Sequence, residues 1–270
     1  MEFKLIPPKN YEYCERTADS ILNSISTKSH ISLSDIRYYD AINYLITNAG
    51  PTKLCLFVEE ERCTFSANSK ELNAEQLKLD YNRKFAYEGI KLGADAINVV
   101  SSAFSKNVSG FTYFSSVGPI MFLNAGIRTW ERTIFTIMHE LVHSFLAMST
   151  PNYTKQVALL NSEYDENPYP EDLQLIESET NVIASLLYAP SCSLNRTIIN
   201  SNFEDLCSTY SMSNSAMHNR LHNFFYYEKG FLEFEAKDAL FAFRNDDKYK
   251  RRKYQKTLGQ SQSKKLDLLS

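Results

Sequence analysis

Hydrophobic residues recur every three or four positions along most of this chain, which predicts a mainly helical protein. Gly50-Pro51 follows the apolar segment at 32–46 and ends it, because glycine supplies a left-handed cap and proline cannot continue a helix. Ala189-Pro190 closes a later segment in the same way. The pattern predicts helices over residues 9–26, 32–46, 80–92, 128–148 and 173–188.

Short apolar runs between the helices predict a few strands. Residues 53–58 form one run, and residues 110–114 and 119–124 form two more, joined by a short turn. The last two predict an antiparallel hairpin, whose edge would let a peptide lie beside it as an added strand. Residues 59–79 and 161–172 are polar and acidic, which predicts loops. The pattern therefore predicts an α+β fold, mainly helical, with a small antiparallel sheet.

The helix predicted at 128–148 carries the sequence H-E-x-x-H. At about 100° per residue, His139 and His143 lie about 40° apart on one face, and Glu140 lies about 100° from His139. An apolar stripe occupies the opposite side and consists of Trp130, Ile134, Ile137, Leu141, Phe145 and Met148. Thr129, with an acid soon after it, is typical of a helix start. We expect the two histidines to face a cleft and bind a metal; the alternative is two surface histidines on an amphipathic helix.

A catalytic zinc takes three protein ligands, so a third is needed. On the helix predicted at 173–188, Glu179 falls among apolar positions, and a bare carboxylate there would cost several kcal/mol that a metal would remove. Glu177 lies about 160° round on the polar face, so Glu179 is the predicted ligand. The alternative pairs Glu179 with Arg132 of the neighbouring helix. The apolar neighbours are Leu175, Ile176, Val182, Ile183 and Leu186.

A second histidine pair, His218 and His222, also has the spacing of one helical turn but lacks an internal glutamate. We expect two half-exposed histidines on a helix. The alternative places either of them near the metal, as a donor to a ligand or as a stabiliser of the oxyanion.

Composition bounds the class of protein. With 43% hydrophobic and 23% charged residues over 270 positions, the chain is an ordinary globular protein with one core and room for an accessory lobe. No run is long enough to span a bilayer, and residues 1–8 lack the layout of a secretion signal. Five cysteines without C-x-x-C spacing favour reduced thiols. We therefore expect a cytoplasmic protein.

The charge is distributed unevenly. From Arg244 onward there are nine Lys or Arg against three Asp, a net charge of +6, so the rest of the chain carries −9 of the total of −3. The basic tail, 244–265, offers contact with nucleic acid or an acidic partner, but a solvated, disordered terminus is the favoured interpretation. We expect an N-terminal helical region at 1–79, a metallopeptidase core at 80–230 and an extension with this tail at 231–270.

Two segments resemble the ImmA/IrrE metallopeptidases, which are gluzincin-like proteins of bacteria, phages and mobile elements. The family shows an apolar strand ending in Asn, then F-T-hydrophobic-x-H-E-hydrophobic-x-H, then E-A-N-x-F-A-x-x-L-L-M-P. Asn124, Phe135 to His143 and Glu179 to Pro190 occupy those places. Ser211 to Leu221 is similar to the family's S-x-x-A-x-x-x-R-L helix, with Ala216 or Met217 near the alanine and Arg220-Leu221 as the final pair. The departures, at Thr180, Ile183 and Tyr188-Ala189, remove no ligand.

The resemblance implies a zincin-like fold and a narrow protein substrate, a helix-turn-helix repressor whose cleavage relieves repression. From the residues, Zn²⁺ held by His139, His143 and Glu179 would bring the pKa of its water toward ~7. Glu140 would take that proton as general base and pass it to the leaving amine. The alternative function is a regulatory protein that binds and sequesters a repressor without cutting it, with a structural metal.

Overall fold

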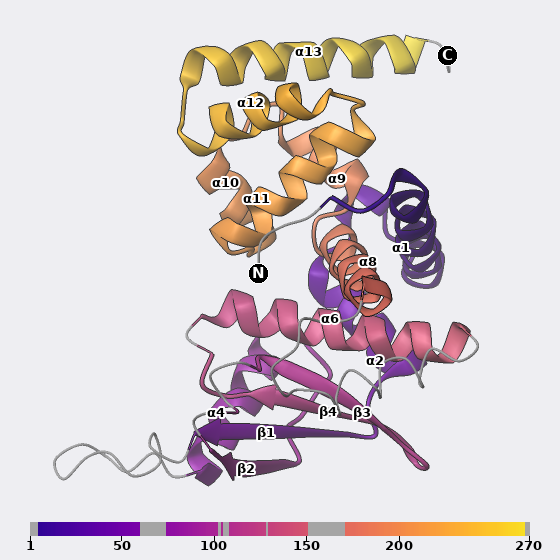
Figure 1. Cartoon of the computed structure of the whole chain (residues 1–270), viewed down its shortest axis with the longest axis vertical. Helices are drawn as coiled ribbons and strands as arrows, with labels where there is room; N and C mark the ends of the chain where they lie inside the picture. Colours follow the sequence, from indigo (N-terminus) through magenta and orange to yellow (C-terminus); the bar gives the residue numbers. More distant parts are fainter. Residues whose placement is uncertain are drawn as a thin grey trace, which may run out of the picture. The chain divides into compact units, whose positions relative to one another are not determined.

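The computed structural model describes residues 5–59, 74–101, 104, 108–127, 129–150 and 171–267 (Figure 1). The chain forms two compact units. The sheet unit is Tyr39–Ala184, and the helical unit combines Met1–Tyr38 with Ser185–Ser270. The boundaries expected after residues 79 and 230 both fall inside a unit, the first in the sheet unit and the second in the helical unit.

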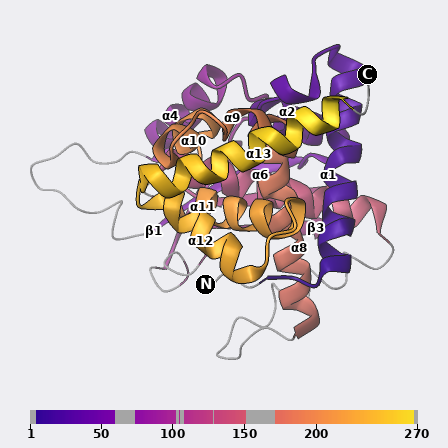
Figure 2. The same ribbon diagram turned by 90° about the horizontal axis from the view of Figure 1, so that it is seen from above.

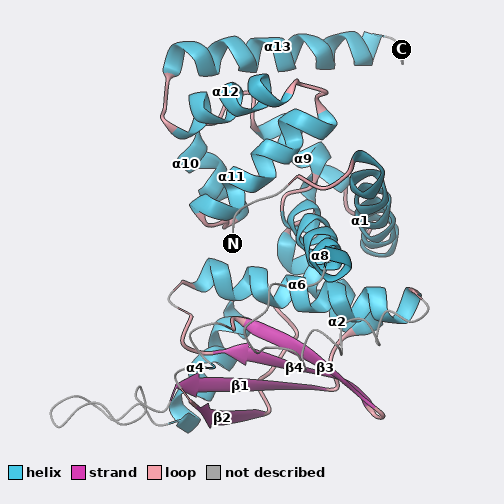
Figure 3. Ribbon diagram, viewed as in Figure 1, coloured by secondary structure: helices cyan, strands magenta, loops and turns pink. Residues whose placement is uncertain are grey.

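The sheet unit contains a four-stranded mixed sheet in the order β2-β1-β4-β3 (Figure 3). Its central strand β1 pairs in parallel with both β2 and β4, whereas β3 pairs antiparallel with β4. The predicted hairpin is therefore confirmed, but the sheet is mixed and not antiparallel throughout. The strands are β1 Lys53–Glu59, β2 Ala96–Val100, β3 Gly110–Ser115 and β4 Gly118–Asn124.

The central place of β1 follows from its composition. Residues 54–58, Leu-Cys-Leu-Phe-Val, are all buried. An uninterrupted apolar run is what a parallel strand covered on both faces requires, whereas a half-exposed strand alternates. β2 was not predicted, because its residues are half-buried or exposed and do not alternate between apolar and polar.

Helix α6 (Trp130–Ser149) packs on the sheet against β3 and β4 (Figure 1). The turn that leads into it is fixed by Asn124, whose side chain donates to the carbonyl of Val108 at 2.8 Å and accepts from the amide of Gly126 at 2.8 Å. The hydroxyl of Thr129 accepts from the amide of Arg132 at the start of the helix. The predicted helix start is therefore confirmed.

α6 lies unusually close to β3. A Cβ atom on Gly110 would sit 2.7 Å from Cγ2 of Thr136 and 3.0 Å from the carbonyl oxygen of Phe122. Only glycine permits this approach without a shift of the neighbours. Beside it, Phe111 stacks on its cross-strand partner Phe122 with ring centroids 4.6 Å apart. The glycine therefore sets how closely the histidine-bearing helix approaches the hairpin, and the ring stack joins the two strands of the hairpin.

The apolar stripe of α6 is buried over most of its predicted length. Ile134, Ile137 and Leu141 are each at most 1% exposed, whereas Met148 is 69% exposed, so the buried face ends before the helix does. Three more helices complete the described part of the sheet unit, and the last continues into the helical unit. They are α2 Tyr38–Ala49, α4 Ala74–Tyr87 and α8 Glu171–Tyr188.

The helical unit brings together elements from both ends of the sequence.

The predicted helix at 32–46 is divided, since the backbone is extended at Ile36 between a 3₁₀ turn and α2. The loops predicted at 59–79 and 161–172 lie largely outside the described residues, although the former gives way to α4 from Ala74. The elements are α1 Pro8–Ser29, η1 Leu33–Asp35, α9 Ser191–Thr197, α10 Phe203–Tyr210, α11 Asn214–Asn223, the π-helical turn η2 Phe224–Glu228, α12 Glu233–Arg244 and α13 Lys248–Asp267.

The basic tail corrects an expectation. In place of a disordered terminus, residues 248–267 form helix α13, because a small apolar side remains among the charges and packs inward. Leu258 is 3% exposed, and Tyr254 packs against Phe231. Within the described residues, no helix combines the length and apolarity that crossing a membrane requires.

A buried ion pair holds the helical unit together. The Arg220 side chain is fully buried and donates to Glu228 at 2.6 Å, to the carbonyl of Ala189 at 2.9 Å and to the hydroxyl of Ser191 at 3.0 Å. Tyr11 of α1 donates to the same oxygen of Glu228 at 2.8 Å. The guanidinium thus links the corner after α8, η2 and the N-terminal helix.

Replacement of Arg220 by Met should lower the free energy of unfolding by about 3–5 kcal/mol, because it leaves the Glu228 carboxylate buried without its cation. Urea denaturation of the full chain measures the loss. Arg196→Met is the control: Arg196 forms an exposed pair with Asp35, and its loss should cost less than about 1 kcal/mol. Equal losses in the two variants would contradict this role for Arg220.

Candidate metal centre

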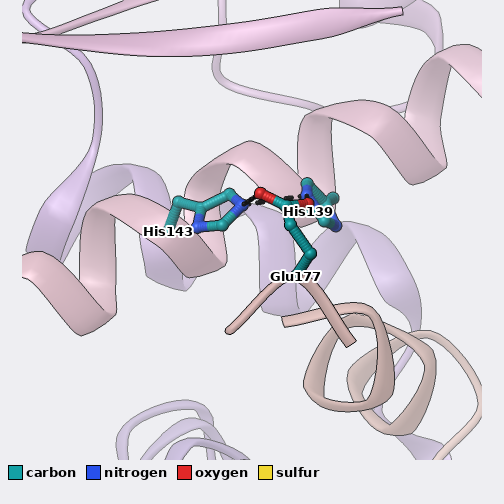
Figure 4. A group of neighbouring side chains, drawn as sticks. All are labelled: His139, His143 and Glu177. Carbon is teal, nitrogen blue, oxygen red and sulfur yellow. Dashed lines mark hydrogen bonds and ion pairs between the residues drawn. The ribbon is translucent and has the colours of Figure 1, made fainter. Parts of the chain in front are cut away.

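Two imidazoles and one carboxylate meet between α6 and α8 in the sheet unit (Figure 4). His139 and His143 stand one turn apart on α6, with their Nε2 atoms 2.9 Å from each other. Glu177 of α8 reaches both, its Oε2 lying 3.2 Å from Nε2 of His139 and its Oε1 3.2 Å from Nε2 of His143. The exposed fractions of these side chains are 14%, 3% and 25%, so the group is largely shielded from water.

The spacing of these atoms suits a tetrahedral cation. With metal–ligand bonds of about 2.0–2.1 Å, ligand atoms at tetrahedral angles lie about 3.3 Å apart. The observed separations of 2.9 and 3.2 Å are close to that value, so a cation needs only a small outward movement of the side chains. Three protein ligands also leave a fourth position open for water or substrate. The three residues thus form a candidate metal site.

The third residue is Glu177, which corrects the prediction of Glu179. Glu179 is half-buried and is not part of the His139–His143–Glu177 group. From Thr180 to Tyr188 every described side chain of α8 except Asn181 is buried. Buried residues therefore occupy all sides of this part of the helix, and apolar neighbours do not identify the face that lines the metal site. The polar side of α8 is the one that lines the site, as the polar side of α6 does.

A second polar residue of α8 supports this orientation. Asn181 follows Glu177 by one helical turn and forms a side-chain hydrogen bond with His139. The pair at positions 177 and 181 therefore faces the pair at 139 and 143. Arg132, considered as a partner for Glu179, instead donates to the hydroxyl of Ser109 at 3.0 Å.

The charges of the group are coupled. Burial alone would lower the pKa of His139, but the hydrogen bond and charge of Glu177, with the charge of Glu140 and the bond to Asn181, raise that pKa above its usual value. Burial would raise the pKa of Glu177, but hydrogen bonds and charges from the two histidines hold it well below its usual range. The carboxylate is therefore ionised at neutral pH, as a metal ligand must be.

Glu140 lies next to the group and contacts the edge of the sheet. Its side chain is buried, and its Oε2 accepts a hydrogen bond of 2.9 Å from the hydroxyl of Thr112 on β3. Thr112 is itself 2% exposed. β3 is one of the two edge strands of the sheet among the described residues, so this bond joins the carboxylate to a strand at the edge of the sheet.

The second histidine pair belongs to the helical unit. Nδ1 of His218 lies 2.8 Å from a guanidinium nitrogen of Arg244, and the ring of His222 stacks near Tyr226. Burial, the charge of Arg244 and His222 lower the pKa of His218. These contacts are with other residues of α11, α12 and η2, and the pair is not part of the described metal-ligating group.

Comparisons with known proteins returned nothing similar: no model of a protein family, no curated protein and no solved structure matches this chain.

The identity of the third ligand can be tested by metal titration. Glu177→Gln should weaken Zn²⁺ binding by at least tenfold, because it removes the anionic ligand, whereas Glu179→Gln should bind like the unaltered chain. Competition against a chromophoric chelator measures both affinities. Tight binding by Glu177→Gln together with loss in Glu179→Gln would restore the original assignment.

Metal affinity should fall as the solution is acidified. Both imidazoles must be neutral to bind a metal, and the raised pKa of His139 means that protons begin to compete above the usual histidine pKa of about 6.5. Zn²⁺ titrations at about pH 8, 7 and 6, corrected for protonation of the chelator, measure this affinity. The affinity should already be lower at about pH 7 than at about pH 8. A constant affinity down to about pH 6 would contradict the role of His139.

Proposed function

We propose that the chain is a zinc-dependent endopeptidase of the ImmA/IrrE type. The observation that carries the proposal is the convergence of His139, His143 and Glu177, two nitrogens and one oxygen at metal-ligand spacing, beside the buried Glu140. Two imidazoles, one carboxylate and an open fourth position are the donor set of hydrolytic zinc sites. Zinc bound there would make its water more acidic and polarise the peptide carbonyl.

Glu140 is the proposed general base and acid. Its carboxylate would accept a proton from the attacking water and deliver it to the nitrogen of the leaving amine. The Thr112 hydroxyl, which donates to Oε2 at 2.9 Å, would hold the carboxylate in one rotamer and leave Oε1 for the proton. Asn181 would orient the ring of His139 through their hydrogen bond.

The edge of β3 supports a peptide as the substrate. This strand pairs with β4 on one side only among the described residues, and it carries Thr112 next to Glu140. An extended peptide that pairs with the other side of β3 would bring its backbone past the carboxylate. The resemblance in sequence narrows the proposed substrate to a helix-turn-helix repressor, whose cleavage would relieve repression.

Glu140→Gln should retain Zn²⁺ affinity and reduce the cleavage rate at least 100-fold, because the amide cannot take the proton. Glu131→Gln is the matched control: it alters an exposed carboxylate in the first turn of the same helix and should leave cleavage unchanged. The assay incubates the purified chain with a helix-turn-helix repressor as the candidate substrate and follows fragments by gel electrophoresis and mass spectrometry.

Three results of that assay are distinguishable. Fragments that disappear with Glu140→Gln and with a chelator support the endopeptidase. A stable complex without fragments, formed equally by Glu140→Gln, would replace it with a protein that sequesters the repressor. Full cleavage by Glu140→Gln would remove the assigned mechanism.

A further inference from the structure

The C-terminal helix α13 is attached to the helical unit by one side only (Figures 1 and 2). The side chain of Leu258 is buried, and Tyr254 donates to Asp238 of α12 at 2.8 Å. Gln255 donates to the carbonyls of Ile198 and Ser201, each at 2.9 Å. These residues define the inward side of the helix, so the opposite side faces solvent within this unit.

The opposite side of α13 is basic. At about 100° per residue, four non-glycine positions between residues 248 and 259 fall within about 60° of the direction that points away from Tyr254 and Leu258. All four are exposed, and Tyr249 is 84% exposed. We call this set the basic face; it consists of Tyr249, Arg252, Lys253 and Lys256, with Lys248 at its margin.

The cations of the basic face form no ion pair with the described residues, although the carboxylate of Asp238, which is bound to Lys250, is also attracted by the charge of Lys253. Residues 248–259 contain six Lys or Arg and no acid. The acids nearby are engaged with other side chains: Asp238 with Lys250 at 2.8 Å, and Asp246 with Arg251. Among the described residues, Arg252, Lys253 and Lys256 form no ion pair, and neither does Lys248. Four positive charges therefore remain exposed along one helix.

We propose that the basic face of α13 binds the phosphate backbone of double-stranded DNA without reading its sequence. Lys248, Arg252 and Lys256 follow one another at intervals of four residues, about 6 Å along the helix. Phosphates repeat every 3.4 Å along the axis of each strand, so a row of cations at this spacing meets successive pairs of phosphates. The exposed ring of Tyr249 adds a flat surface for contact with sugar or base.

The rest of the chain fits a contact restricted to this helix. Residues before Arg244 carry a net charge of −9, so phosphates repel the body and are attracted by the tail. An anionic membrane is the less suitable partner, because a helix that inserts into a membrane surface needs an apolar face toward the lipid. In α13 the apolar residues are already used against the helical unit.

Fluorescence anisotropy with a labelled duplex of arbitrary sequence tests the proposal on the full chain. Four phosphate contacts predict that log K falls with log[NaCl] with a slope of about −3.6 between about 50 and 200 mM salt. The triple variant Arg252→Glu, Lys253→Glu and Lys256→Glu should lose at least tenfold in affinity at about 50 mM salt and reduce the slope to about −1. The neutral triple variant with Gln at the same positions should give the same reduction in slope without added repulsion.

The matched control makes the same change of charge elsewhere: Lys9→Glu, Arg83→Glu and Lys91→Glu, all at exposed positions outside α13. It should keep the slope of the unaltered chain. Circular dichroism checks that each variant remains folded, as expected for exposed substitutions. The proposal is overturned by the absence of duplex binding at low salt, by an equal loss in the control, or by tighter binding to phosphatidylserine vesicles than to the duplex.

Discussion

The carboxylate of Glu177 between two imidazoles is the interaction on which the candidate site depends. The two imidazoles and the carboxylate lie 2.9 and 3.2 Å apart and are largely shielded from water. A carboxylate buried in this way without a positive partner would be costly in free energy. A cation, or protons on the histidines, repays that cost. The same contact joins α6 to α8, so a change in the charge of the site also affects the packing of these two helices.

The surroundings of α6 explain how its histidines keep their place. Asn124 fixes the turn before the helix, and Gly110 lets the helix approach β3 more closely than any side chain would permit. At that distance the Thr112 hydroxyl reaches Glu140. The polar residues that α6 contributes to the site are therefore positioned by backbone features of the hairpin, which favours a fixed geometry.

Local patterns in the sequence predicted local structure well. The helix start at Thr129, the hairpin and the pairing of His139 with His143 follow from capping, alternation and helical spacing, all of which involve residues close in the chain. Features that depend on distant partners were missed. β2 was not recognised because its apolar contrast is weak, and its parallel pairing with β1 involves strands separated by α4.

Glu177 was considered and rejected for a more instructive reason. The prediction assumed that the apolar face of α8 is directed toward the metal. It therefore selected Glu179, the carboxylate whose burial without a metal would be most costly in free energy. On α6 the opposite principle had placed the histidines away from the apolar stripe. α8 is buried nearly all round from Thr180 onward, so its apolar residues do not indicate the direction of the site, whereas the half-buried polar residues Glu177 and Asn181, one turn apart, do. The prediction of a disordered tail was also wrong, because a count of charges does not show that a few residues, such as Leu258, can pack against the helical unit.

The helical unit has a consequence for the order in which the protein matures. Tyr11 near the start of the chain meets Glu228 near its end, and Arg220 closes the connection. During synthesis, residues 39–184 are made after α1 but before Arg220 and Glu228, so α1 then lacks these two partners. α1 therefore cannot complete its packing until α11 and η2 have been made, and until then its apolar side chains, Tyr11, Ile21 and Leu22 among them, are less covered than in the folded unit.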